Sequence, residues 1–312
     1  MLTVGIFLPL WRYDGDFRNM SGQGPVITAA DRAGFGALWV RDVPLQVNPT
    51  ADVGQVYDPW TYAAWLAAKT DQIAIATGSV IFTLRHPIDL AKQAASLDQL
   101  SGGRLILGVA SGDRPVEFPA YGVDFESRAA RFRGAIGTVR ALLDAASGRA
   151  VPLPDDAELL PKPTFGRIPM LVTGMARQTE AWIAEHADGW LTYPGATTNI
   201  DGPRQLGEKI ARTRSLVRDD RFLPVATNEW IDLVENPAFP PTPLDGGRVM
   251  RTGTEGLLEL LDRWQQNGVN HGALGVQHGE RPAADVIQQL GEEVVPHFPV
   301  HANAPPPAVP VW

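Results

Sequence analysis

Short apolar runs alternate with longer segments whose apolar residues recur at helical spacing along most of the chain. The short runs are rich in β-branched and aromatic residues, which is typical of buried strands. The runs expected to form strands are residues 4–8, 37–40, 73–80, 105–109, 168–172, 189–192, 225–233 and 272–276. The segments expected to form helices are residues 25–33, 59–68, 87–100, 129–145, 179–186, 199–218, 254–266 and 283–295.

Repeated strand–helix units in a chain of 312 residues predict an α/β fold, a (β/α)8 TIM barrel with insertion loops at the C-terminal face. A doubly wound open sheet is the competing fold. Neither half of the chain has a Gly-x-Gly-x-x-Gly turn after its first strand or a Walker-type loop, which weakens that alternative. We expect a single barrel domain over residues 1–300 and a Pro-rich tail at 301–312.

Three segments interrupt the repeat, at residues 41–58, 147–169 and 236–253. The last two are rich in proline and glycine, which predicts surface excursions or lids over the mouth of the barrel.

Composition narrows the classes of partner. The net charge is −8 with both signs interspersed, which argues against nucleic acid. The chain has no cysteine, which excludes disulfides and thiolate metal sites and suits a cytoplasmic location. No apolar stretch approaches the roughly 18–20 residues that cross a bilayer. We therefore expect no membrane partner. The histidines lack metal-ligand spacing, so we expect no bound metal.

Candidate functional residues lie where the expected strands end, because ligand-binding groups of such barrels gather there. They are Arg41 and Asp42, Gly78 and Ser79, residues 111–114, residues 174–179, and residues 228–230. The turn after Gly174 leads straight into a helix, so its unpaired N–H groups suit a phosphate. The alternative is an ordinary turn in which Thr179 only caps the helix.

Three motifs are more specific: TGSVIFTLRHP at 77–87, LDQLSGGR at 97–104 and LGVASG at 107–112. With residues 115–118, 121–123, 127–133 and 172–187, they resemble the luciferase-like monooxygenase family. That family includes bacterial luciferase, alkanesulfonate monooxygenases and deazaflavin (F420)-dependent reductases. The resemblance covers most of residues 1–200 and implies a TIM barrel that binds a flavin-type cofactor, FMN or alternatively F420.

The resemblance also implies positions for the cofactor. It assigns the phosphate to a loop that contains Gly174, Met175, Ala176 and Thr179, with an arginine nearby that is Arg128 or Arg131. It places Ser111 and Gly112 along the ribityl chain. It implies that Gly78 and Ser79 lie against the ring, where this pair often forms a non-prolyl cis peptide.

The chain departs from the family just after the second strand. Luciferases carry a histidine there and many F420 enzymes carry Asp-His, whereas this chain reads Arg41-Asp42-Val43-Pro44. A catalytic, proton-handling role would then fall to Asp42, beside Arg41, and would need a pKa raised by burial. Asp42 could instead pair with Arg41 or orient substrate. Of the two histidines that flank the last strand, only His278 is placed to reach the mouth.

Three functions remain open. The first is a monooxygenase that uses O2 and reduced FMN, supplied by a separate flavin reductase, on a small organic substrate. Residues 112–117 resemble the alkanesulfonate branch and favour this reading. The second is an F420-dependent hydride-transfer oxidoreductase, and the third is a flavin-binding barrel without turnover. The family also implies a homodimer.

Overall fold

Parallel strands form a closed barrel in the computed structural model. The structure describes residues 1–10, 22–46, 57–144, 153–154, 156–199, 201–218 and 221–300. The barrel strands are β1 (Thr3–Phe7), β2 (Ala37–Val40), β3 (Ala74–Thr77), β5 (Leu105–Ala110), β6 (Met170–Thr173), β7 (Gly189–Leu191), β8 (Val225–Leu233) and β11 (His271–Gly275). Each pairs with the next in this order, and β11 pairs with both β8 and β1, which closes the ring. The predicted TIM barrel is confirmed.

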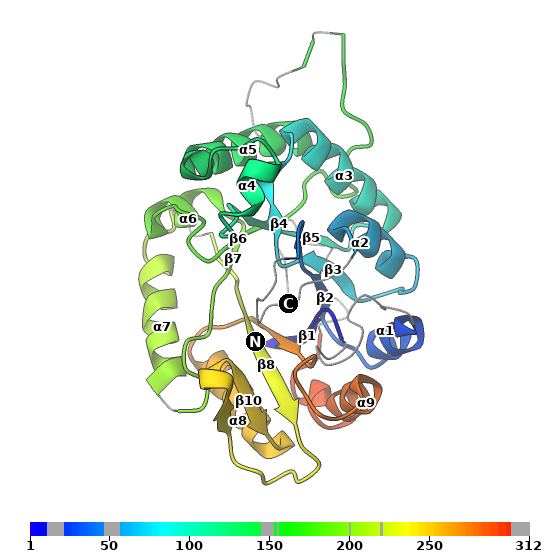
Figure 1. The fold of residues 1–312 in the computed structure, drawn as a ribbon, viewed down its shortest axis with the longest axis vertical. Helices are drawn as coiled ribbons and strands as arrows, with labels where there is room; N and C mark the ends of the chain where they lie inside the picture. Colours follow the sequence, from blue (N-terminus) through cyan, green and yellow to red (C-terminus); the bar gives the residue numbers. More distant parts are fainter. Residues whose placement is uncertain are drawn as a thin grey trace.

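Helices surround this ring (Figure 1). They are α1 (Gln23–Arg32), α2 (Pro59–Ala67), α3 (Pro87–Leu100), α5 (Arg128–Leu143), α6 (Glu180–His186), α7 (Asp201–Arg214), α8 (Thr254–Gln266) and α9 (Ala283–Glu293). Proline opens α2 and α3, where its missing N–H has no helical partner to lose. The apolar faces of the helices pack on the outer side of the strands and form the main core.

Two expected segments differ from the structure. Residues 73–80 form two strands, β3 and β4 (Val80–Ile81), separated by Gly78 and Ser79. The excursion at 236–253 contains β9 (Thr242–Leu244) and β10 (Val249–Thr252), and β10 pairs with residues 230–233 of β8. The reason is that β8 runs past its pairing with β11, so the backbone groups of its last residues need another partner.

The structure adds a short helix, α4 (Glu117–Ala120), that the apolar pattern does not predict. The tail predicted at 301–312 lies outside the described residues.

The side chains of Trp39, His271 and Thr3 fill the lower part of the barrel interior and are linked by hydrogen bonds. The Trp39 indole N–H donates to His271 Nε2 over 2.8 Å, and His271 Nδ1 lies 2.8 Å from Thr3 Oγ1. Burial lowers the pKa of His271 to about 3, so the ring is neutral. Gly5 is required beside it, because a Cβ there would lie 2.4 Å from Nε2.

Higher up, Trp230 of β8 lies across the last residue of β11. A Cβ on Gly275 would lie 2.0 Å from the Trp230 ring. We expect Gly275→Ala to lower the free energy of unfolding by about 1–3 kcal/mol, because overpacking forces the ring from its position. Denaturant titration followed by circular dichroism measures this change.

The matched control for this prediction is Gly134→Ala in α5, where an added Cβ meets no atom within 4 Å. Alanine is favoured over glycine inside a helix by about 1 kcal/mol, so this variant should be as stable as the wild type or more so. A Gly275→Ala protein as stable as Gly134→Ala would contradict the packing described here.

Candidate functional site

A cavity of about 680 Å³ opens at the C-terminal ends of the barrel strands. This volume lies in the range of small-molecule sites, about 300–1,000 Å³. It is lined by most of the residues singled out from the sequence: Arg41, Asp42, Gly78, Ser79, Ser111, Gly112, Arg128, Gly174, Met175 and Ala176. The ends of β3, β5 and β6 therefore meet at one mouth. The peptide bond between Gly78 and Ser79 is cis, as the resemblance implied.

Of the residues assigned to the cofactor or to catalysis, Arg131 and Thr179 do not line this cavity. Arg131 lies one turn further into α5 than Arg128, and its Nε donates to the Thr83 carbonyl over 3.1 Å. The Thr179 hydroxyl accepts a hydrogen bond from the Trp182 N–H over 3.1 Å and caps α6. The structure thus gives Thr179 the role that the alternative reading assigned to it. Cofactor contacts of these two residues stay a prediction.

The turn after β6 has an unusual backbone. Gly174, Ala176 and Arg177 have φ values of 55°, 43° and 61°, in the left-handed region that non-glycine residues rarely adopt. Within the described part of the chain, Gly174 N–H donates to Leu191 and Gln178 N–H to Met175, but no backbone acceptor is seen for the intervening N–H groups. Such successive N–H groups form a concavity that suits an anion.

Arg128 brings a positive charge to this end of the cavity. Its side chain is buried, its guanidinium carbon lies 3.4 Å from the centre of the Phe125 ring, and Nη1 donates to the Phe125 carbonyl over 2.5 Å. These contacts hold the guanidinium at the first turn of α5. The cavity end therefore combines backbone N–H groups with a fixed cation, which is what a phosphate requires.

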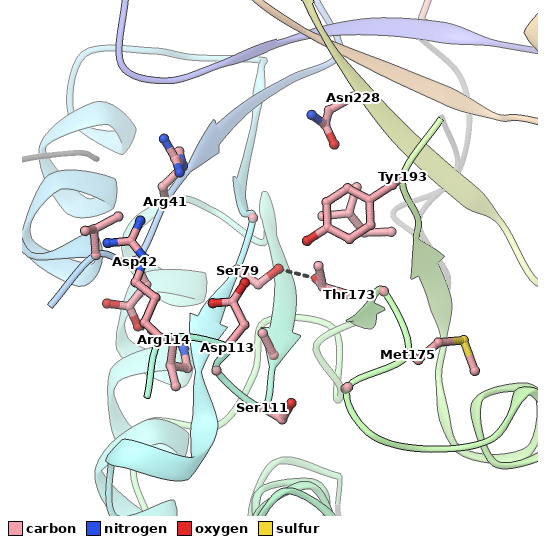
Figure 2. Close-up of a pocket in the computed structure, with 18 of the residues that line it drawn as sticks. Arg41, Asp42, Ser79, Ser111, Asp113, Arg114, Thr173, Met175, Tyr193 and Asn228 are labelled. Carbon is pink, nitrogen blue, oxygen red and sulfur yellow. Dashed lines mark hydrogen bonds between the residues drawn. The ribbon is translucent and has the colours of Figure 1, made fainter. Parts of the chain in front are cut away.

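The floor and the opposite side of the cavity carry different chemistry. The Ser79 and Thr173 hydroxyls are hydrogen-bonded to each other across the mouth (Figure 2). Trp230 packs edge-on against Phe7 and against His278, with ring centres 5.3 and 5.2 Å apart. The side of the cavity around Trp230 is therefore mainly aromatic.

Several lining residues were not predicted: Phe7, Thr173, Tyr193 and Arg248. Phe7, Thr173 and Tyr193 stand at or just after strand ends, a position that could have identified them. Arg248 comes from the β9–β10 extension, and no local pattern marks it. His278 lines the cavity, as expected from its place after β11.

Asp42 forms an ion pair with Arg85, so the suggested pairing with Arg41 is wrong. Its Oδ1 accepts from Arg85 Nη2 over 2.9 Å, and its Oδ2 accepts from Arg85 Nη1 over 2.5 Å and from Ile81 N–H over 2.8 Å. Arg41 is not among the groups that hydrogen-bond Asp42 or shift its pKa. Burial raises the pKa of Asp42, while Arg85 and the Ile81 N–H oppose that rise.

This ion pair ties the end of β2 to the segment that follows β4. Its geometry gives Asp42 a positioning role, and proton transfer by Asp42 stays a prediction.

Glu229 lies between two cavity-lining residues, Asn228 and Trp230, but it is not among the lining residues. Neighbours on a strand alternate between the two faces, so Glu229 points outward, where it is buried. One carboxylate oxygen accepts from the Trp230 N–H over 2.9 Å, and Thr197 also hydrogen-bonds the carboxylate. Burial outweighs these bonds and raises the pKa of Glu229 to about 7.

Residues 16–220 match the family model described as luciferase-like monooxygenase. The chain belongs to the luciferase-like monooxygenase family. This match spans the phosphate-type turn, the Gly78–Ser79 pair and Arg128, the features that meet in the cavity.

Relatives with several activities resemble this luciferase-like chain. An uncharacterized protein of Mycobacterium tuberculosis is 34% identical over 162 residues, which are 49% of this chain and 55% of that protein. An F420-dependent glucose-6-phosphate dehydrogenase of Beutenbergia cavernae is 38% identical over 117 residues, 36% of this chain and 34% of that enzyme. The matched part thus spans about half or less of these curated relatives.

Among solved structures, a monooxygenase from Streptomyces bottropensis superposes with a TM-score of 0.75 at 21% identity, covering 95% of this chain and 100% of that one. At this identity the likeness establishes the shared barrel fold.

In the described ranges, no helix combines the length and apolar character needed to cross a bilayer. The same residues contain no group of three His, Asp or Glu side chains arranged to hold a metal ion.

The raised pKa of Glu229 predicts that the free energy of unfolding changes with pH. Its folded-state pKa of about 7 lies above the ordinary value of 4.5, so its favourable contribution is complete below pH 4.5 and is lost as the pH rises through 7. We expect Glu229→Gln to gain stability relative to the wild type by up to about 3 kcal/mol between pH 5 and pH 8. Denaturant titrations at both pH values measure this difference.

The exposed Glu185→Gln on α6 is the control and should follow the wild-type profile. If the difference in the free energy of unfolding between Glu229→Gln and the wild type is the same at pH 5 and pH 8, Glu229 does not titrate in this range.

Asp42→Asn should lower the free energy of unfolding by about 1–3 kcal/mol, because it leaves Arg85 without its charged partner. The control is Asp113→Asn, another lining carboxylate, for which we expect a smaller loss. Thermal unfolding of both variants measures the effect, and equal losses would mean that the Asp42–Arg85 pair does not stabilise the fold.

Proposed function

We propose that the protein is a flavin-dependent oxidoreductase, specifically a luciferase-like monooxygenase that uses reduced FMN and O2 on a small organic substrate. The observation that carries this proposal is the turn at residues 174–177, whose left-handed backbone meets Arg128 at one end of the cavity. Membership of the luciferase-like family supports the same chemistry.

In this proposal the N–H groups of the turn and Arg128 would bind the phosphate of the cofactor. Ser111 and Gly112 would contact the chain that links phosphate and ring, and Gly78 and Ser79 would contact the ring. A bound flavin supplies the hydride and oxygen chemistry. The protein positions the ring and the substrate, and the aromatic side chains Phe7 and Trp230 exclude water from the reacting face.

An F420-dependent hydride-transfer oxidoreductase is the second candidate, favoured by the similarity to an F420-dependent dehydrogenase. Both cofactors carry a phosphate, so the turn at 174–177 suits either. The chain lacks the imidazole that both luciferases and many F420 enzymes carry after the second strand, so this position does not separate the two cofactors; it argues only against a sugar-phosphate or alcohol dehydrogenase that depends on that histidine. A barrel that binds flavin without turnover is the third.

The proposal extends to partners. A separate flavin reductase would supply reduced FMN, and the protein would act as a cytoplasmic homodimer. Co-purification with a reductase and sedimentation analysis test these two points.

Titration with FMN and with F420, followed by quenching of cofactor fluorescence, tests cofactor binding. Arg128→Gln should weaken binding by about tenfold or more, because it removes a charge-assisted contact to phosphate. Arg131→Gln, from the next turn of α5, tests the alternative arginine and should bind nearly as the wild type does, because Arg131 does not line the cavity. Unchanged binding by Arg128→Gln would remove Arg128 from the phosphate site, and weaker binding by Arg131→Gln would place Arg131 in it.

The reaction type needs a second measurement. Oxygen consumption and substrate oxidation with reduced FMN would support the monooxygenase. Substrate-dependent reduction of F420 without oxygen would support the second candidate, and the absence of turnover with both would support the third.

A further inference from the structure

A second cavity, of about 470 Å³, lies between α5 and α6 on the outside of the barrel. Figure 1 shows these two helices as neighbours. The cavity is lined in part by Asp188, directly before β7, and by Arg221, shortly before β8. Because the strands begin at the face opposite the mouth, this cavity extends toward that face. Among the described residues, none lines both cavities. We call the second cavity the α5–α6 groove.

Asp188 is the buried carboxylate of the groove, and two arginines bind it. Its Oδ2 accepts a hydrogen bond from Arg140 Nη2 over 2.9 Å, and its Oδ1 forms an ion pair with Arg167. Oδ2 also accepts from the Met170 N–H over 3.0 Å. One carboxylate therefore serves two guanidinium groups.

Arg221 adds a third guanidinium group beside this pair. Its Nη1 and Nη2 donate to the carbonyl oxygens of Ala187 and Ala184 at the end of α6. Arg140 Nη2 donates to the His186 carbonyl oxygen over 3.0 Å, so Arg140 and Arg221 are held side by side at one helix end. A helix end carries only about half a negative charge, and within the described ranges Arg221 forms no ion pair. The three arginines thus exceed their one aspartate by two positive charges.

Arg133 brings another positive charge to the far end of the groove. It precedes Arg140 by seven residues in α5, so the two share a helix face and lie about 10 Å apart along the axis. Its Nη1 donates to the neutral side chain of Gln178 over 3.0 Å, and Arg133 forms no ion pair in the described part of the chain. The carboxylate of Glu185 also lines the groove, but it is 64% exposed and water screens its charge.

Two stacked rings lie along α6 between these ends. Trp182 and His186, one turn apart, have ring centres 4.6 Å apart and planes inclined by 6°. His186 Nδ1 lies 3.0 Å from the Trp182 carbonyl oxygen, which orients the imidazole. Ile136 and Gly137 of α5 line the groove as well, and Gly137 adds no side chain to narrow it. The groove therefore offers a flat, mainly apolar surface beside its positive charges.

We propose that the α5–α6 groove is a second ligand site, separate from the mouth, that binds a phosphate monoester carrying a flat ring, such as a nucleotide. The guanidinium groups of Arg140 and Arg221 bind the phosphate, and the Trp182–His186 pair binds the ring. A phosphate monoester carries about two negative charges at neutral pH, which match the excess at this end of the groove. The inference goes beyond the proposed function and does not depend on it.

The test compares AMP with adenosine, which lacks the phosphate, and with inorganic phosphate, which lacks the ring. Each is titrated against the protein at low ionic strength and followed by calorimetry. We expect AMP to bind at least about tenfold more tightly than either of the other two. No saturable binding of AMP, or an affinity for adenosine or inorganic phosphate equal to that for AMP, would overturn the proposal.

Two arginine variants locate the AMP site. Arg221→Gln should weaken AMP binding by about tenfold and leave adenosine binding unchanged, because it removes one charged partner of the phosphate. Arg128→Gln, at the mouth, should leave AMP binding unchanged. A loss with Arg128→Gln alone would place AMP in the phosphate turn and overturn the proposal.

A second pair of variants tests the groove without removing any arginine that binds the end of α6. Gly137→Asp and Gly137→Asn add side chains of the same shape to the groove, and only the first adds a negative charge. Gly137→Asp should bind AMP about tenfold more weakly than Gly137→Asn, because its carboxylate repels the phosphate. Circular dichroism checks that both variants fold, and equal affinities for AMP would overturn the proposal even if Arg221→Gln fails to fold.

The groove and the mouth are thereby tested separately. A protein that binds AMP in the groove but binds neither FMN nor F420 would refute the proposed function and retain this inference. A protein that binds FMN at the mouth but does not distinguish AMP from adenosine would refute only the groove site.

Discussion

Closure of the parallel sheet by β11, which pairs with both β1 and β8, is the constraint on which the site depends. Because all barrel strands run in one direction, closure brings their C-terminal ends to a single mouth. Segments as distant in sequence as Arg41 and His278 thereby line one cavity. In an open sheet the ends of β2 and β11 would not face the turn after β6, and the cavity would have no opposite walls.

Large and small residues on the inner face of the barrel determine where this cavity begins. Trp39 and His271 fill the lower interior, and glycine at position 5 makes room for them. At the mouth, Trp230 takes the space above Gly275 and leaves the region over Gly78 and Ser79 open. Packing therefore closes one end of the barrel and presents hydroxyl, amide and guanidinium groups at the other.

Two buried carboxylates near the mouth show how local environment decides their chemistry. Asp42 is hydrogen-bonded by both arms of the Arg85 guanidinium and by the Ile81 N–H, so its charge is balanced where it lies. Glu229 has no cation among the groups that shift its pKa, and its ionisation is delayed to about pH 7. Asp42 therefore carries a charge that Arg85 balances, whereas Glu229 is neutral below about pH 7.

The sequence by itself determined the order of strands and helices, the barrel class and the segments that meet at the mouth. The spacing of apolar residues and the points at which strands end can be read from short stretches of sequence. The motifs around Gly78, Ser111 and Gly174 are likewise continuous in sequence. Only the tertiary structure showed that Asp42 pairs with Arg85 and that Glu229 points away from the cavity. It also showed that Arg128, not Arg131, lines the cavity and that Arg248 reaches it from the β9–β10 extension. These depend on the register of closure and on the depth at which each helix packs, because contacts between residues far apart in sequence form only when the strands have closed into a ring.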